Sequence, residues 1–402
     1  MPNLPRKSRT GRATAAVLTL ALLAALGAAP AALSARADIE YAVFDPSPAG
    51  TVFYARAPVQ WRVVPLGGSR VTDFSLTIND QRVDAAYDAA TGAVTHLPGS
   101  ALPPGVHRVR ALVTLDGEAN IDREWEFRVD RRALPTLPAP QPKQGAVLNA
   151  VNRVRQDAGL PALRPDARLF AAAQAHAEYL RRNNAGGHLQ VPGRPGFLGR
   201  QPSDRARAFG YSGGSYEDVS QGEPDPVRAV QGLFDAPYHR EPFLQLGDFE
   251  VGAGADGDRI TVLFGMGRGS GIVRFPGAGQ KNVPLSWDGN ETPDPLRHHR
   301  GPDGRRPRGP FGYPITLFVY DRGLTPDAPK VRIRSALLAT ADGRVVPAYV
   351  NTAANDEALS GGSVLLIPHA PLKPSTDYRV IAELDRGRTT ETLSWWFRTA
   401  GR

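Results

Sequence analysis

Three side chains in this sequence are of types that hold a metal ion or transfer a proton: His188, Glu217 and His239. They lie in the stretches GGHL, YEDVS and PYHREPFL. Two imidazoles and one carboxylate form a ligand set that zinc uses, leaving one coordination position open. Since the three residues lie on separate segments, only the fold can bring them together. We therefore treat them as a candidate Zn²⁺ site. The plainer alternative is a hydrogen-bonded polar cluster without metal or turnover.

Other catalytic signatures are missing from the sequence. The chain of 402 residues has no cysteine, which excludes a thiolate nucleophile, a thiolate metal site and disulfides. It also lacks the His-Glu-x-x-His, Gly-x-Ser-x-Gly, phosphate-loop and dinucleotide glycine motifs. The sequence therefore identifies no catalytic residue.

Two further polar residues near the candidates have simpler interpretations. His176 lies on the apolar stripe of a predicted helix, so we expect a hydrogen-bonded core histidine and not a ligand. Asp218 follows Glu217, and we expect its carboxylate to bond nearby backbone rather than enter the site.

The candidates belong to a segment that has helical spacing first and strand patterns afterwards. The predicted helices cover 144–160, 165–184, 204–210 and 225–237, and the predicted strands cover 248–255 and 259–267. Ser203 is expected to cap the short helix, and Val227, Val230 and Phe234 are expected to face inward. The pattern predicts an α+β domain, with helices packed against a small sheet.

Both flanks of this segment have the period-2 alternation of β-strands. The sequence predicts a β module at 38–130, a Pro-rich linker at 131–143 and a second β module at 271–402. A basic loop rich in Pro, Gly and Arg, 294–314, carries His298 and His299. It could hold an anionic wall polymer or lipid headgroups, but the preferred interpretation is a solvated, flexible insertion.

The two flanking modules resemble each other. Residues 102–130 and 372–400 both show a Pro-led turn, a strand, a polar hairpin and a last strand with Trp and Phe two apart. Trp125 with Phe127, and Trp395 with Phe397, therefore share a strand face. Core packing is preferred over an aromatic carbohydrate platform. The modules are similar to bacterial immunoglobulin-like domains, which implies small all-β sandwiches that act as spacers.

Residues 1–37 have the pattern of a signal peptide, with a basic start, an apolar run and Ala35-Arg36-Ala37 before the expected mature start at Asp38. An uncleaved anchor is the less favoured alternative. Without this segment the chain has 43 Lys and Arg against 40 Asp and Glu, a net charge of +3. Such a small charge gives no indication of nucleic-acid binding. No second apolar span follows, so we expect a secreted or cell-envelope protein without a transmembrane segment in its mature part.

The order of motifs from LNAVNRVRQDAGLPAL through GH, DRARAFGY, YEDVS and PYHREPFL to FEVGAGA resembles the CAP family. This family comprises the cysteine-rich secretory, antigen 5 and pathogenesis-related 1 proteins, also called SCP-like. The resemblance covers residues 144–270 and is strongest to the bacterial secreted branch. It implies a central α-β-α sandwich with a cavity lined by two histidines and two acids. Matched motif by motif, the histidines are His188 and His239, and one acid is Glu217.

The second acid of the family pattern has no match. The stretch after His188, LQVPGRPGFLGRQPSDR, holds no Glu, and its only acid, Asp204, is expected to belong to the short helix. Of the four cavity residues in the family pattern, this sequence therefore matches three, which are His188, Glu217 and His239.

The resulting hypothesis is an exported protein that binds a ligand without catalysis. The cavity around His188, Glu217 and His239 would take a small apolar or amphipathic ligand, or a cell-wall or glycan fragment, with or without a divalent metal such as Zn²⁺. One alternative is a zinc-dependent hydrolase of peptide or ester bonds. Another is a structural surface protein with a vestigial site. The sequence makes no prediction about the oligomeric state.

Overall fold

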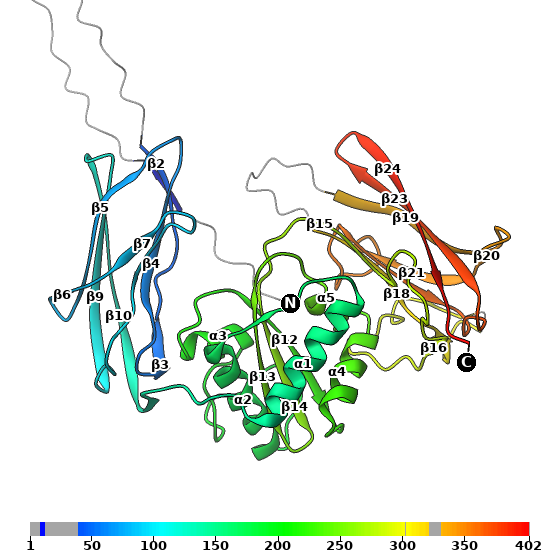
Figure 1. The fold of residues 1–402 in the computed structure, drawn as a ribbon, viewed down its shortest axis with the longest axis horizontal. Helices are drawn as coiled ribbons and strands as arrows, with labels where there is room; N and C mark the ends of the chain where they lie inside the picture. The colour runs from blue at the N-terminus through cyan, green and yellow to red at the C-terminus, as the bar shows by residue number, and fades with distance from the viewer. Residues whose placement is uncertain (1–8, 13–38, 302, 321–330, 402) are drawn as a thin grey trace, which may run out of the picture. The chain divides into compact units, whose positions relative to one another are not determined.

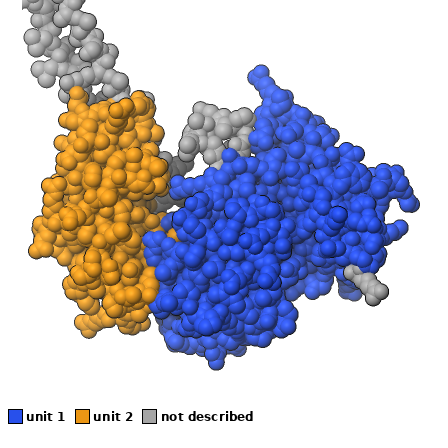
Figure 2. Space-filling view, viewed as in Figure 1, with its two compact units in different colours: residues 1, 138–206, 213–402 blue, residues 2–137, 207–212 orange. Residues whose placement is uncertain are grey.

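The computed structural model describes residues 9–12, 39–301, 303–320 and 331–401. The chain divides into two compact units (Figures 1 and 2). One contains residues 2–137 and 207–212, and the other contains residues 138–206 and 213–402.

The predicted signal peptide, 1–37, lies outside the described residues except for β1 (Arg9–Arg12). This strand pairs antiparallel with β2 (Glu40–Val43). Within the described ranges, no helix is long and apolar enough to cross a membrane.

The N-terminal unit contains two β-sheets, as the alternation in 38–130 predicts. Their strand orders are β1-β2-β4-β8-β7 and β3-β10-β9-β5-β6. The further strands are β3 (Gly50–Tyr54), β4 (Val59–Pro65), β5 (Val71–Ile78), β6 (Gln81–Val83), β7 (Ala86–Asp88), β8 (Ala93–His96), β9 (Gly105–Leu115) and β10 (Ala119–Leu134). One cluster of buried side chains from both sheets, including Trp61 and Phe127, forms the core.

The predicted linker is shorter than its sequence suggests. Strand β10 continues to Leu134 and the first helix begins at Pro142, so only residues 135–141 lack regular structure between them. The prolines in this stretch cannot donate ladder hydrogen bonds, which is consistent with where the strand ends.

The middle segment, 142–265, places helices on both faces of a sheet of order β11-β13-β14-β12 (Figure 1). Helix α2 lies on one face, and α1, α4 and α5 lie on the other. The bounds are α1 (Pro142–Asp157), β11 (Arg164–Pro165), α2 (Ala167–Arg182), α3 (Pro202–Ala208), β12 (Ser215–Gln221), α4 (Pro226–Asp235), α5 (Arg240–Phe243), β13 (Glu250–Asp256) and β14 (Arg259–Gly265). This is the predicted α-β-α arrangement.

Helix α2 approaches the sheet closely because β13 has glycines beneath it. A Cβ added at Gly252 or Gly254 would lie 2.2 Å from backbone atoms of α2. The start of α2 is fixed by Asp166, whose carboxylate accepts hydrogen bonds from the backbone N–H groups of Arg168 and Leu169. The Asp166 cap and the two glycines of β13 fix the position of α2, and thereby the point at which the following loop begins.

Two local predictions in this segment were wrong. Ser203 does not cap α3, because the helix begins at Pro202 and includes Ser203. The carboxylate of Asp204 instead accepts a hydrogen bond from the backbone N–H of Gln201. Val227 is 50% exposed, since it lies in the exposed first turn of α4. Val230 and Phe234 are buried as predicted.

The C-terminal module, 271–401, contains sheets of order β15-β18-β22-β21, β20-β19-β23-β24 and β16-β17. Its strands are β15 (Gly271–Phe275), β16 (Ser286–Trp287), β17 (Phe311–Gly312), β18 (Ile315–Tyr320), β19 (Val331–Thr340), β20 (Val345–Val346), β21 (Ala348–Thr352), β22 (Ser363–Pro368), β23 (Asp377–Arg386) and β24 (Thr389–Arg398). Trp395 and Phe397 are buried on one face of β24, which confirms core packing for this pair. Trp396, between them, is exposed.

The C-terminal module is not a spacer, contrary to expectation, because it shares a hydrophobic core with the helical segment. A single cluster of buried residues runs from Val147 in α1 through Phe234 in α4 to Phe275 and Ile315. The rings of Phe234 and Phe275 pack edge to face, with centroids 4.7 Å apart. The fully buried guanidinium of Arg240 donates to the carbonyl of Pro314 at 2.8 Å.

The described part of loop 294–314 is anchored at its start, whereas most of its residues between 298 and 310 are exposed, as expected for a solvated insertion. Leu296 is fully buried, and Arg297 pairs with Asp356 at 2.6 Å and Glu357 at 3.0 Å. The sequence pattern showed the arginines of the loop, but not that Arg297 pairs with the distant acids Asp356 and Glu357.

Candidate functional site

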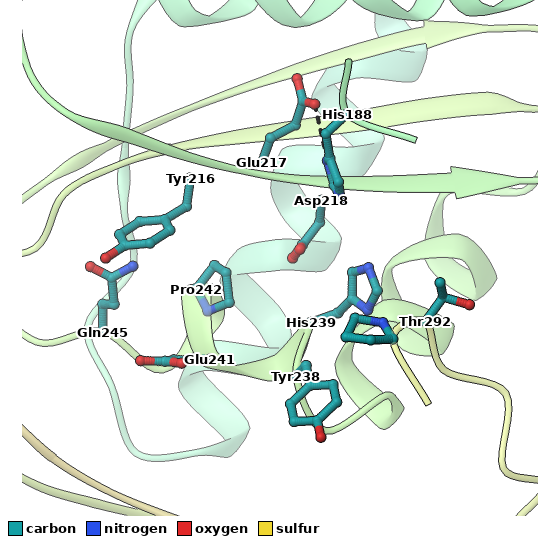
Figure 3. A pocket seen from close by; sticks show the side chains of 11 residues that line it. His188, Tyr216, Glu217, Asp218, Tyr238, His239, Glu241, Pro242, Gln245 and Thr292 are labelled. Atoms are coloured by element: carbon teal, nitrogen blue, oxygen red, sulfur yellow. Dashed lines mark hydrogen bonds and ion pairs between the residues drawn. The ribbon is translucent and has the colours of Figure 1, made fainter. Parts of the chain in front are cut away.

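A cavity of about 220 Å³ lies where β12, the turn before α5 and the segment after β16 meet (Figure 3). The lining residues are His188, Tyr216, Glu217, Asp218, Tyr238, His239, Glu241, Pro242, Gln245, Thr292 and Pro293. All three residues predicted for the site therefore line one cavity. The imidazole centroids of His188 and His239 are 6.4 Å apart.

His188 is held by a buried carboxylate–guanidinium pair. Its Nδ1–H donates to Oε1 of Glu217 at 3.1 Å, and Oε2 of Glu217 accepts from Arg205 at 2.6 Å. The side chains of Glu217 and Arg205 are fully buried. Because an ionised carboxylate only accepts, the Nδ1 atom of His188 carries the proton.

Glu217 is kept ionised by its neighbours. Burial alone would raise its pKa, but the charge of Arg205 and the hydrogen bond from His188 hold the pKa below its ordinary value. Glu217 is therefore an anion that orients His188.

His176 is a hydrogen-bonded core histidine, as predicted. It is fully buried, and its Nδ1 accepts from the side-chain amide of Gln190 at 3.1 Å. Its Nε2 donates to the carbonyl of Gly187 at 3.1 Å. Burial is the main reason why its pKa falls to about 4, so this imidazole is neutral at neutral pH.

Glu217 and Asp218 point to opposite faces of β12, as successive strand residues do. Glu217 is paired in register with Leu263, and Asp218 with Val262 (Figure 3). Both line the cavity, and β12 is the edge strand of its sheet.

Asp218 was expected to bond nearby backbone, but its carboxylate faces the cavity. The residue is 2% exposed, and its Oδ2 atom is buried without a hydrogen-bond partner in the described residues. Burial is the largest influence on the group and raises its pKa to about 7, although His239 and His188 act to lower it. The cavity thus contains one unsatisfied acceptor.

The second histidine also has a carboxylate partner, and this one comes from outside the helical segment. His239 Nδ1–H donates to Oε1 of Glu291 at 2.6 Å, and the same carboxylate accepts from the backbone N–H of Tyr238 at 2.9 Å. Burial would lower the pKa of His239, but Glu291 and Asp218 raise it to about 9. His239 is therefore an imidazolium at neutral pH.

Glu291 is a second carboxylate that holds a cavity histidine, in addition to Glu217. It lies in the segment between β16 and β17, about a hundred residues after His188, and its side chain is fully buried. Nothing in its surroundings, WDGNETPDPL, marks it as a site residue, and sequence reasoning missed it together with Arg205. The only available signal was an acid directly beside the predicted loop 294–314.

The neighbours of His239 are fixed by the C-terminal module as well. The hydroxyl of Tyr238 donates to Asp356 and accepts from Arg297 at 3.0 Å. The hydroxyl of Tyr313 donates to Asp235 at 2.6 Å, near the end of α4. With the Arg240–Pro314 bond, these contacts hold the turn between α4 and α5 against the C-terminal module.

The predicted zinc ligands do not fit a three-residue site in this arrangement. Both oxygens of Glu217 are engaged by His188 and Arg205, and each imidazole already uses Nδ1 for a carboxylate. Only the Nε2 atoms would remain for a metal. In the described part of the chain, no group of three or more His, Asp or Glu side chains is placed to hold a metal ion. Zinc binding stays a prediction from the sequence.

Comparison with known protein families identifies a match within the helical segment. Residues 148–255 match the family described as "CAP: Cysteine-rich secretory protein family". No curated protein matches the chain significantly.

Among solved structures, an extracellular protein containing an SCP domain from Bacillus anthracis is 14% identical, with 57% of this chain and 85% of that chain covered and a TM-score of 0.28. A cysteine-rich secretory protein from Staphylococcus aureus is 8% identical, with 56% and 82% covered and a TM-score of 0.24. CopC from Methylosinus trichosporium OB3b is 23% identical, with 22% and 91% covered and a TM-score of 0.18.

Proposed function

Because the chain carries a CAP domain at residues 148–255, we propose that it is an exported protein that binds a small ligand without converting it. The ligand is a small molecule or the end of a cell-envelope polymer such as a glycan fragment. Export rests on the signal-peptide pattern of residues 1–37. The CAP domain and the C-terminal module form the binding site jointly.

The cavity between His188 and His239 is the observation that carries this proposal. Its volume of about 220 Å³ is far larger than the ~15 Å³ that a single water requires, so the cavity has room for one compact ligand. The walls present polar groups in fixed positions, because Glu217 and Glu291 each orient one imidazole. A cavity with a few convergent polar groups is the usual form of a small-molecule site.

The lining supports binding more than hydrolysis. It includes no serine or cysteine that could act as a nucleophile. The zinc-dependent hydrolase, the alternative from the sequence, needs Glu217 as a ligand, and both oxygens of that carboxylate are engaged. We therefore derive no step through a metal.

A fragment screen by NMR on the isotope-labelled protein tests the proposal. We expect at least one fragment to shift the signals of Asp218, His239 and Thr292 together. Thr292→Phe, which puts a ring into the cavity, should abolish these shifts while the rest of the spectrum stays folded. A screen without cavity shifts contradicts the proposal. So does ester or peptide turnover that His239→Ala removes, because turnover would make the protein a hydrolase.

A further inference from the structure

Asp218 is the cavity group whose hydrogen bonding is incomplete. Its Oδ2 atom is buried and has no partner in the described residues, although the residue is only 2% exposed. Nearly all buried polar groups in native proteins are paired, and an unpaired charged one is costly. Figure 3 shows this side chain on the cavity side of β12, near His239. A donor for this atom can therefore approach it from the cavity.

The carboxyl groups around His239 outnumber the cations, because Asp218 and Glu291 share the one imidazolium of His239. Glu217 is paired with Arg205 at 2.6 Å, and His239 is paired with Glu291 at 2.6 Å. Within each pair the charges cancel. A narrow cleft with excess negative charge concentrates cations.

The remaining walls suit an organic cation better than a bare ion. Tyr216, Tyr238, Pro242 and Pro293 contribute rings to the lining. Aromatic faces attract ammonium groups and also cover apolar carbon. Across the described residues no three-ligand metal cluster exists, so a compact organic body is the better occupant of about 220 Å³.

We infer that the cavity is selective for small organic amines in their protonated form, and that the Asp218 carboxylate binds the ammonium group. This inference rests on the proposed binding function and specifies its ligand class. Glu217 and Glu291 act on the imidazoles, whereas Asp218 contacts the ligand.

A matched pair of probes tests the amine class. Benzylammonium and benzyl alcohol have the same shape and differ in the charge of one group. We expect calorimetry on the purified protein at neutral pH to show benzylammonium binding about tenfold or more tightly than benzyl alcohol, as for a charged hydrogen bond in a buried site. Asp218→Asn keeps the shape of the side chain and should remove the preference. Asp248→Asn makes the same chemical change on an exposed carboxylate, 75% accessible, and should keep it.

Three outcomes would overturn the inference. Equal binding of both probes, or preference for the alcohol, rejects the amine class but leaves the cavity a binding site. A loss of affinity for both probes by the same factor in Asp218→Asn shows that Asp218 supports the fold and does not select the ligand. If neither probe binds up to its solubility limit, the amine class is rejected. The fragment screen then decides separately whether the cavity binds anything.

Discussion

His239 and Glu291 are joined by a 2.6 Å hydrogen bond although 52 positions separate them in the chain. The imidazole belongs to the CAP domain, and the carboxylate belongs to the segment that leads into the C-terminal module. A carboxylate on Nδ1 fixes both the ring orientation and the proton position. The ring orientation and proton position of His239 therefore depend on how the CAP domain packs against the C-terminal module.

Replacing the carboxylate should change the proton affinity of the imidazole. Glu291→Gln removes the charge that holds the pKa of His239 near 9, so we expect this pKa to fall by about 1–3 units. Imidazole NMR titration measures it directly. Glu357→Gln, a similar change on an exposed acid, should leave it unchanged. An unaltered His239 pKa in Glu291→Gln would show that Glu291 is not its main partner.

The His239–Glu291 bond also predicts a loss of stability at alkaline pH. The folded pKa of His239, about 9, lies above its unfolded value of 6.5. The folded state thus binds the proton more tightly, which adds to the free energy of unfolding. This added stability is complete below pH 6.5 and is lost as pH rises through 9. Denaturant unfolding at several pH values should show the decline. Glu291→Gln should flatten it, and an equal decline in that variant would contradict the assignment.

The buried carboxyl of Asp218 should cost stability wherever it is ionised. Its folded pKa of about 7 exceeds the ordinary value of 3.8, so the folded state is favoured below pH 3.8 and loses this advantage as pH rises through 7. Asp218→Asn should therefore stabilise the protein by roughly 1–4 kcal/mol at about pH 8 and change little at about pH 4. Thermal unfolding at both pH values measures the difference. Destabilisation at the higher pH would mean that Asp218 has a partner in the folded protein.

Breaking the Arg205–Glu217 pair should be strongly destabilising. Arg205→Met leaves a fully buried carboxylate without its cation, which typically costs about 3–5 kcal/mol. The double variant Arg205→Met/Glu217→Leu removes both charges and should recover most of this loss. Urea unfolding of the three proteins compares them. A single variant as stable as the parent would show that the imidazoles alone compensate Glu217.

Zinc titration tests the metal prediction from the sequence. Both oxygens of Glu217 are engaged, and His239 must lose a proton before it can coordinate, so we expect no tight one-to-one binding of Zn²⁺ at neutral pH. Calorimetry on the parent and on His188→Ala/His239→Ala should give the same weak heats. Tight binding that the double variant loses would establish the zinc site.

The elements were predictable where local pattern decides them. Helical periodicity and caps indicated α1, α2 and α4, alternation indicated β4 and β5, and short apolar runs indicated β18 and β22. Glu217 and His239 were accessible through ordered family motifs. Glu291 was not, because a buried carboxylate acquires its role only when a distant segment packs beside it. The same holds for Arg205, whose burial opposite Glu217 leaves no trace in the spacing of DRARAFG.

The shared core between α4 and β15 has a consequence for how such chains can be recombined. Phe234, Phe275 and Arg240 pack across the boundary that a domain exchange would cut. A foreign module grafted after residue 270 would have to reproduce this contact surface and also deliver an acid to His239. The two parts are therefore expected to be inherited as a pair, and substitutions at positions 239 and 291 should accompany each other across lineages.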